Sequence, residues 1–302
     1  MDPYGADSTA ERIVGRGAAD MKAGLAMILA TAGNWARSPG PGRLVVALTC
    51  DEEHASIGMQ SLVGEDLVGE AAVVAEPTSL AVIPAHKGFE WVEVEFRGRA
   101  AHGSRPEVGV DAIRHAAALL HEMDSLEASL RGAVPHPLLG HGSFHAGTIK
   151  GGSTWSVYPD RCRLTLERRT LPDEEPGVFL REVERCLERL RGRVSHLEVT
   201  TRQDLIRPGS DVPPDHDLVR GLCDSIEAEG GPSRVEGMTA WVDAAFLNAA
   251  GIPAVCFGPG SIANAHAADE FVLADEVRVA TRILQRFVRR YLSGDPRSGG
   301  ED

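Results

Sequence analysis

The stretch Leu44-Val45-Val46-Ala47-Leu48-Thr49-Cys50-Asp51-Glu52-Glu53-His54 passes directly from an apolar run into three consecutive acids. A short run rich in Leu and Val predicts a buried strand of an α/β sheet, and open α/β sheets hold their ligands in the loops that follow the strands. Adjacent carboxylates repel one another, so a cation or a bound proton must offset them there. The stretch therefore predicts either a metal site or an acidic turn in solvent.

The composition indicates a globular protein that acts on small molecules. The 302 residues are 43% hydrophobic and 25% charged, and this length allows two domains. The formal net charge of -13 repels the phosphates of nucleic acids and anionic lipids. No apolar stretch is long enough for a bilayer span, and the first residues contain no signal-peptide pattern. We therefore expect a cytoplasmic protein that binds neither nucleic acid nor membranes.

The cysteines are odd in number and contain no Cys-x-x-Cys pair, which favours reduced thiols in the core: Cys50, Cys162, Cys186, Cys223 and Cys256. Cys50 could act as a nucleophile in a thiol hydrolase. The neighbouring acids disfavour this alternative, because negative charge raises the pKa of a thiol.

The hydrophobic pattern changes twice along the chain. Residues 1–86 and 206–302 contain short continuous apolar runs, which are typical of strands buried on both faces. Residues 87–205 instead alternate polar and apolar side chains, and their elements follow the β-α-β-β-α-β order of a ferredoxin-like domain. The sequence thus predicts an α/β catalytic domain with a mostly parallel sheet, interrupted by an inserted α+β domain.

The elements expected from periodicity are as follows. Helices are predicted over residues 23–35, 58–63, 110–124, 177–190, 215–228, 243–250 and 274–291. Strands are predicted over residues 44–49, 71–75, 90–97, 143–149, 161–169, 196–200 and 252–257.

Five side chains fall in loops of the expected catalytic domain: Asp20, Glu52, Glu53, Glu76 and His266. Carboxylate oxygens and imidazole nitrogens are ligands that Zn²⁺, Mn²⁺ or Co²⁺ accept. A pair of such ions needs a bridging carboxylate, and a further carboxylate must take the proton from the attacking water. Asp20 could alternatively be an ordinary helix cap.

Taken in order, the motifs resemble those of the di-zinc amidohydrolases that include acetylornithine deacetylase, succinyl-diaminopimelate desuccinylase, aminoacylase and glutamate carboxypeptidase. The motifs are Gly15 to Lys22, Asp51-Glu52-Glu53, Glu76-Pro77-Thr78, His102-Gly103 and Gly258 to His266. The resemblance implies a zinc-peptidase-like catalytic domain that hydrolyses an amide bond next to a carboxylate, as in N-acyl amino acids or small peptides. It also implies up to two Zn²⁺ ions per subunit, with Co²⁺ or Mn²⁺ as alternatives.

The resemblance also assigns roles to the candidate metal ligands. Asp20 would bridge the two ions, and Glu52 would be the general base. Glu53 and His266 would complete one metal site, and Glu76 would bind the other ion.

Two further residues are assigned through the inserted domain. In this family the domain forms a homodimer and acts as a lid that lends a histidine to the partner's active site, where it holds the developing oxyanion. His102 matches that histidine. Arg169 lies in a region that lines the substrate pocket, where its guanidinium could bind a substrate carboxylate bidentately. A surface ion pair is the other interpretation of Arg169.

One departure from the family pattern concerns the first metal ligands. Members carry a His-x-Asp motif on an early strand, whereas no His precedes Asp20 in this sequence. The resemblance thus implies an N-terminally shortened member in which one of the two metal sites is impaired. Two hypotheses follow: a metal-dependent hydrolase, or a catalytically impaired relative that serves as a binding or regulatory subunit.

Overall fold

The computed structural model describes residues 4–5, 8–65 and 67–294. The chain divides into two compact units. The first comprises Met1–Ala85, Ser210–Met238 and Val242–Asp302, and the second comprises His86–Gly209 and Thr239–Trp241.

The first unit is built on a mixed sheet with the strand order β2-β10-β3-β8, in which β9 also pairs with β3. The strands are β2 (Ala72–Val74), β3 (Val82–His86), β8 (Ser210–Asp211), β9 (Val235–Met238) and β10 (Ala254–Cys256). β10 runs parallel to β2 and antiparallel to β3, so the sheet is less parallel than the sequence predicts. A separate antiparallel ribbon joins β1 (Arg12–Val14) to β11 (Phe271–Leu273).

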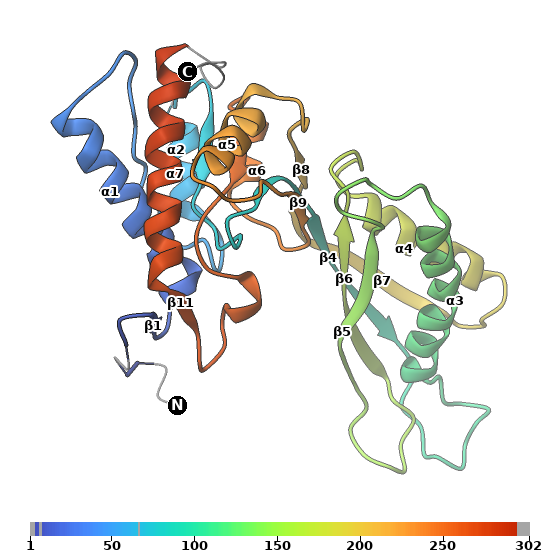
Figure 1. Ribbon diagram of the computed structural model, residues 1–302. Coiled ribbons are helices and arrows are strands. Elements are labelled where there is room, and N and C mark those ends of the chain that lie inside the picture. The colour runs from blue at the N-terminus through green and yellow to red at the C-terminus, as the bar shows by residue number, and fades with distance from the viewer. Residues whose placement is uncertain (1–3, 6–7, 66, 295–302) are drawn as a thin grey trace. The chain divides into compact units, whose positions relative to one another are not determined.

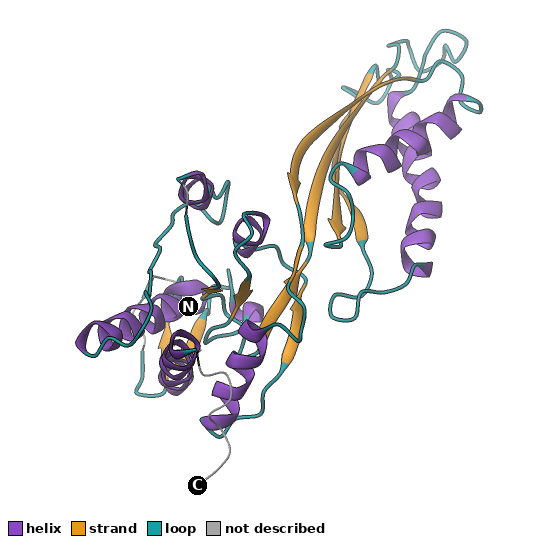
Figure 2. Ribbon diagram, turned by 90° about the horizontal axis from the view of Figure 1, so that it is seen from above, coloured by secondary structure: helices purple, strands orange, loops and turns teal. Residues whose placement is uncertain are grey.

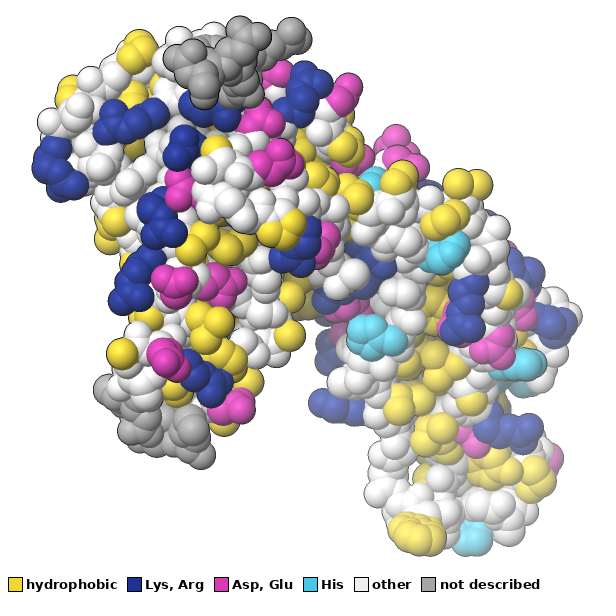
Figure 3. Space-filling model, in the orientation of Figure 1, with side chains coloured by type: hydrophobic (Ala, Val, Ile, Leu, Met, Phe, Trp, Pro, Cys, Tyr) yellow, Lys and Arg dark blue, Asp and Glu magenta, His cyan; other side chains and the backbone are white. Residues whose placement is uncertain are grey.

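Helices pack around this sheet, and α1, α7 and α5 lie side by side (Figure 1). The helices of the first unit are α1 (Ala23–Arg37), α2 (Ile57–Gly64), α5 (Asp217–Ala228), α6 (Ala244–Ala249) and α7 (Ala274–Ser293). Their apolar faces meet the strands in a core that includes Met27, Val82, Leu222, Val255 and Ile283. Basic and acidic side chains are interspersed on the outer surface of these helices (Figure 3).

Helix α1 approaches the sheet closely at its first turn. A Cβ atom on Gly24 would lie 2.0 Å from the carbonyl oxygen of Ala75, a distance that no side chain tolerates. Glycine at this position therefore sets how closely α1 packs against the residue that follows β2.

The second unit is a four-stranded antiparallel sheet of order β5-β6-β4-β7 with two helices on one face (Figure 2). Its elements are β4 (Gly88–Arg97), α3 (Ala112–Gly132), β5 (Ser143–Gly151), β6 (Arg161–Thr170), α4 (Val178–Arg191) and β7 (Glu198–Arg207), in the order that the sequence pattern predicts. Val92, Val94 and Phe96 of β4 are buried in this unit's core, whereas the alternating residue Trp91 is exposed. Alternation with period 2 thus gives this sheet one face covered by the helices and one open face.

The strand expected over residues 44–49 is absent, and this prediction is wrong. The run has no regular secondary structure and belongs to no ladder, and Val45 and Leu48 are 52% and 65% exposed. An extended segment becomes a strand only when a neighbour accepts its backbone hydrogen bonds. Within the described part of the chain no strand pairs with this run, and β2 at the edge of the sheet pairs only with β10.

The remaining differences lie mostly at element ends. Helix α3 extends to Gly132, and β7 extends to Arg207, both beyond the predicted ends. The short strands β1, β3, β8, β9 and β11 were not predicted. No helix within the described residues combines the length and apolar character that a membrane crossing requires.

Candidate active site

Three of the predicted ligands meet in the first unit, although they come from distant parts of the chain. The Nε2 atom of His266 lies 3.4 Å from Oδ2 of Asp20 and 3.0 Å from Oε2 of Glu53. One ligand atom from each residue falls within 4.8 Å of the other two. The imidazole and both carboxylates therefore converge on one point, as the ligands of a single cation do.

The loop that carries Asp20 is fixed by a buried carboxylate. Glu270 accepts hydrogen bonds from the backbone N–H groups of Gly17, Ala19 and Asp20 at 2.9, 2.9 and 3.0 Å. Burial would raise the pKa of Glu270, but these three hydrogen bonds and the charge of Arg16 outweigh it and hold the pKa below its usual value. Glu270 is therefore ionised and positions the loop.

Asp20 is not a helix cap. Helix α1 begins at Ala23, its N-cap is Lys22, and Asp20 has extended backbone angles of φ -114° and ψ 96°. Its carboxylate is thus available to a ligand, and the alternative of an ordinary cap is wrong.

Glu52 and Glu53 lie in a tight turn before α2. The carbonyl oxygen of Asp51 accepts hydrogen bonds from the backbone N–H groups of Ala55 and Ser56 at 3.1 and 2.6 Å. Burial raises the pKa of Glu52 to about 7, with further contributions from Asp243, Glu53 and Asp20. Glu52 therefore has the pKa of a group that can exchange a proton near neutral pH.

Glu76 follows β2 and is 4% exposed. Burial raises its pKa well above the usual value, and the charges of Glu52 and Asp20 add to this effect. Burial likewise raises the pKa of Asp20, and Glu53 contributes in the same direction. Carboxylates buried near one another remain ionised only if positive charge is supplied, so the donor set fits a divalent cation.

Asp243 belongs to the same acidic group, although no motif in the sequence points to it. It is 3% exposed, and its charge raises the pKa values of both Glu52 and Glu76. Asp243 directly precedes α6, but its side chain makes no capping hydrogen bond. No pattern in the sequence singles out this residue, because its effect on the site depends on its burial and on neighbours from distant parts of the chain.

His102 and Arg169 lie in the second unit. Nδ1 of His102 is 2.8 Å from Oγ of Ser104 and accepts a hydrogen bond of 3.2 Å from the backbone N–H of Ser104. The neutral ring therefore carries its proton on Nε2, which can donate a hydrogen bond. Arg169 donates from Nε to Oε1 of Glu167 at 2.8 Å, and its guanidinium carbon lies 5.3 Å from the centroid of the Phe89 ring.

Comparison with known proteins identifies relatives along most of the chain. A family model described as Peptidase family M20/M25/M40 matches residues 1–290. The acetylornithine deacetylase of Myxococcus xanthus is 31% identical over 94% of this chain and 73% of its own length. The acetylornithine deacetylase of Vibrio cholerae is 29% identical over 96% of this chain and 76% of its own length.

Solved structures show the same fold. The aminopeptidase PepT of Bacillus cereus gives a TM-score of 0.79 at 19% identity and covers 94% of this chain and 75% of its own. An M20 family metallo-carboxypeptidase of Sulfolobus solfataricus gives a TM-score of 0.75 at 16% identity, with coverage of 97% and 80%.

The α/β fold class that the sequence predicts is confirmed, and so is the resemblance to the metal-dependent amidohydrolases. The relatives are hydrolases, which makes this protein a metal-dependent hydrolase of the metallopeptidase and deacetylase kind. They give no support to the alternative of a non-catalytic binding subunit. The motifs, the geometry of the acidic site and these likenesses agree that the chain belongs to peptidase family M20/M25/M40.

Proposed function

We propose that the protein hydrolyses the amide bond of N-acyl amino acids, or of small peptides that carry a carboxylate. The observation that carries this proposal is the convergence of Asp20, Glu53 and His266 with the half-buried Glu52 beside them. The acetylornithine deacetylases among the relatives favour N-acetylated amino acids as the substrate class.

The cation in this proposal is Zn²⁺, with Co²⁺ or Mn²⁺ as alternatives, because mixed imidazole and carboxylate ligands suit these ions. Asp20, Glu53 and His266 would hold one ion, and Asp20 and Glu76 would share in a second and weaker site. When bound, a divalent ion supplies Lewis acidity that polarises the scissile carbonyl and lowers the pKa of water.

Glu52 is the general base in this reaction. Its pKa of about 7 in the metal-free protein leaves it able to accept a proton from the attacking water and to return that proton to the leaving nitrogen. Glu52 lies outside the group of three converging ligand atoms, which is consistent with proton transfer as its function.

The second unit is the dimerisation and lid domain in this proposal, and its expected bounds are residues 87–205. His102 would donate the hydrogen of its Nε2 to the oxyanion in the partner's active site. Arg169 would bind the substrate carboxylate. A cytoplasmic location remains a prediction from the sequence.

Substitution of Glu52 by Gln tests the proposal. Glu52→Gln should reduce the hydrolysis of N-acetyl amino acids by roughly a thousandfold while the bound Zn²⁺, measured by elemental analysis, stays at the parental level. Glu53→Gln is the matched control, because it should lose metal as well as activity. Metal loss in the Glu52 variant together with metal retention in the Glu53 variant would mean that the two roles are reversed.

A further inference from the structure

Lys87 is a buried cation with an incomplete set of partners. Lys87 is 8% exposed, and its Nζ atom donates a hydrogen bond of 2.6 Å to the carbonyl oxygen of His141. Among the described residues no carboxylate forms an ion pair with it. Buried ammonium groups are usually paired with an anion, because removing the charge from water is costly. The unused N–H groups of Lys87 therefore point to a ligand.

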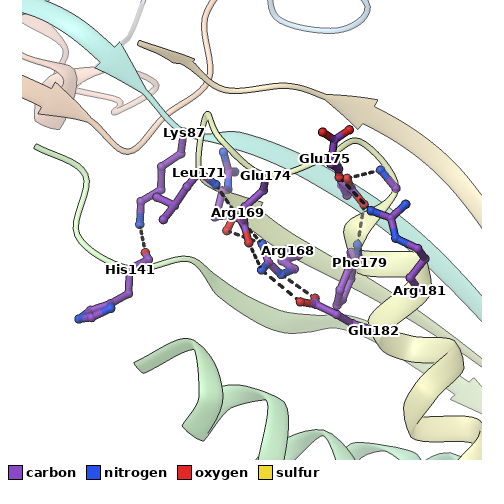
Figure 4. Close-up of polar contacts among 12 residues, drawn as sticks. Lys87, His141, Arg168, Arg169, Leu171, Glu174, Glu175, Phe179, Arg181 and Glu182 are labelled. Atoms are coloured by element: carbon purple, nitrogen blue, oxygen red, sulfur yellow. Dashed lines mark hydrogen bonds and ion pairs between the residues drawn. The ribbon is translucent and has the colours of Figure 1, made fainter. Parts of the chain in front are cut away.

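A second cation lies beside Lys87. Arg169 of β6 pairs with Phe89 of β4 in the antiparallel ladder. Lys87 directly precedes β4 and lies two positions before Phe89, so the alternation of side chains places Lys87 and Arg169 on the same face of the sheet. Figure 4 draws Lys87 and Arg169 in the same region, with the ammonium group of Lys87 directed at the carbonyl oxygen of His141. Burial lowers the pKa of Lys87, and the charge of Arg169 lowers it further.

The guanidinium of Arg169 is held in a fixed orientation through Nε, and its two Nη groups remain available to a ligand. Glu167 accepts a hydrogen bond from Nε, and the ring of Phe89 lies under the guanidinium. The two Nη groups make no hydrogen bond within the part of the chain that the structure describes. A guanidinium fixed through Nε presents its two Nη groups as a fork that matches the two oxygens of a carboxylate.

We propose that Lys87 and Arg169 together form an anion-binding site for the carboxylate of the substrate, with Lys87 as a specificity-determining residue. The inference rests on the proposed function, in which Arg169 alone binds the carboxylate, and adds the second cation to it. Arg169 would bind the carboxylate bidentately, and the ammonium of Lys87 would contact one of the same oxygens. Lys87 thereby acquires the counter-charge that its buried position lacks.

The two cations also explain how an acidic protein binds an acidic substrate. The chain carries a formal charge of -13, so its overall field repels carboxylates. A local pair of cations overcomes that repulsion at short range, where screening by salt is least. A carboxylate-bearing substrate would therefore be selected over its neutral amide.

Binding to the metal-free full-length chain tests the site without turnover. Calorimetric titration with N-acetylalanine should show binding to the parent and roughly ten- to hundredfold weaker binding to Lys87→Met, because a charge-assisted contact is lost. Lys150→Met is the matched control, since Lys150 is an exposed cation on β5 of the same sheet and should not alter the affinity. N-acetylalaninamide should bind weakly to all three proteins.

The competing explanation is that Lys87 only fastens the loop that contains His141. In that case Lys87→Met would bind N-acetylalanine as the parent does and would show only a lower melting temperature, and this result would overturn the proposal. Lys87→Arg should recover part of the affinity, whereas an isosteric neutral side chain should not. Absence of carboxylate binding to the folded parent would also overturn it.

Kinetics on the metal-loaded protein separate this inference from the proposed function. Lys87→Met should raise KM for N-acetylalanine with little change in kcat, and should leave kcat/KM for N-acetylalaninamide unchanged. N-succinylalaninamide carries its carboxylate on the acyl side. Its KM with the parent and with Lys87→Met shows whether the site binds a carboxylate on the acyl side or on the amino-acid side of the substrate. If the parent hydrolyses no amide, the proposed function fails, but the titration still decides whether the anion site exists.

Discussion

The carboxylate of Glu270 accepts a hydrogen bond of 3.0 Å from the backbone N–H of Asp20, across a sequence separation of 250 residues. Glu270 is 1% exposed and follows His266 by four positions, so one side chain joins two of the three loops that supply ligands. The geometry of the site therefore depends on a residue that is not one of the three converging ligands.

Glu270→Gln should lower both the stability and the Zn²⁺ affinity of the protein. One amide oxygen cannot replace two charged oxygens, so we expect a loss of about 2 kcal/mol in the free energy of unfolding and roughly tenfold weaker metal binding. Urea unfolding and competition with a chromophoric chelator measure the two quantities. Asp275→Asn, which alters an exposed acid nearby, is the control. Parental metal affinity in a destabilised Glu270 variant would show that the contact serves only the fold.

The metal-free protein should become more stable near pH 8 when Glu52 is replaced by Gln. The pKa of Glu52 is raised to about 7 in the folded state from 4.5, so the folded state binds the extra proton between these values and loses stability as the pH rises through them. The variant should match the parent near pH 5 and exceed it by on the order of 1–3 kcal/mol near pH 8. Unfolding in urea with a chelator present measures both. A larger gain in the free energy of unfolding near pH 5 than near pH 8 would contradict a raised pKa for Glu52.

Zn²⁺ should raise the melting temperature of the parent more near pH 8 than near pH 5. Burial raises the pKa values of the proposed ligands Asp20 and Glu76, so at low pH protons compete with the ion for these carboxylates. Thermal melts with and without Zn²⁺ at the two pH values provide the measurement. Equal shifts at both values would place the ion elsewhere.

Two inactive variants should complement one another if His102 acts across a dimer. Mixtures of His102→Ala and Glu52→Gln subunits should recover up to about a quarter of the parental activity, because each hybrid dimer retains one intact site. His121→Ala, at an exposed histidine of α3, should remain active by itself. Failure to recover activity after proven subunit exchange would show that the site is not shared.

Gly24 and Gly33 of α1 should respond oppositely to substitution by Ala. A Cβ on Gly24 would meet the carbonyl oxygen of Ala75 at 2.0 Å, whereas at Gly33 the nearest neighbour is a flexible Arg37 nitrogen at 3.7 Å. We expect Gly24→Ala to cost about 3 kcal/mol and Gly33→Ala to stabilise the helix by about 0.5–1 kcal/mol. Urea unfolding of both variants tests this, and a neutral Gly24→Ala would show that α1 can move away from the sheet.

Local patterns in the sequence were sufficient for most of the elements. The period-2 alternation of β4 and the helical periodicity of α4 and α7 depend on neighbours a few residues away, and the structure contains all three elements near the predicted positions. The run at residues 44–49 has an equally clear pattern but forms no strand. Membership of a sheet depends on a partner strand, which periodicity does not detect.

In the candidate site, too, the residues found by local motifs differ from those that depend on distant contacts. Motif order was enough to single out Asp20, Glu53 and His266, and the structure brings their ligand atoms together. Asp243, Glu270 and Lys87 were not identified, because each matters through contacts with residues far away in the sequence. Their burial identifies them only once the fold is known.

Residues 44–49 are mostly exposed and belong to no helix or strand, so a protease can reach this part of the backbone. Proteases bind their substrates as extended segments, and a run outside any helix or strand can adopt that shape without the unfolding of an element. A brief digestion should therefore cleave near Leu48 first. The cut would separate Asp20 from Glu53 along the chain, while the packing of α1 on α7 and the hydrogen bonds of Glu270 would hold the two fragments together. A nicked protein that still binds Zn²⁺ would show that the centre is maintained by contacts and does not require an unbroken backbone.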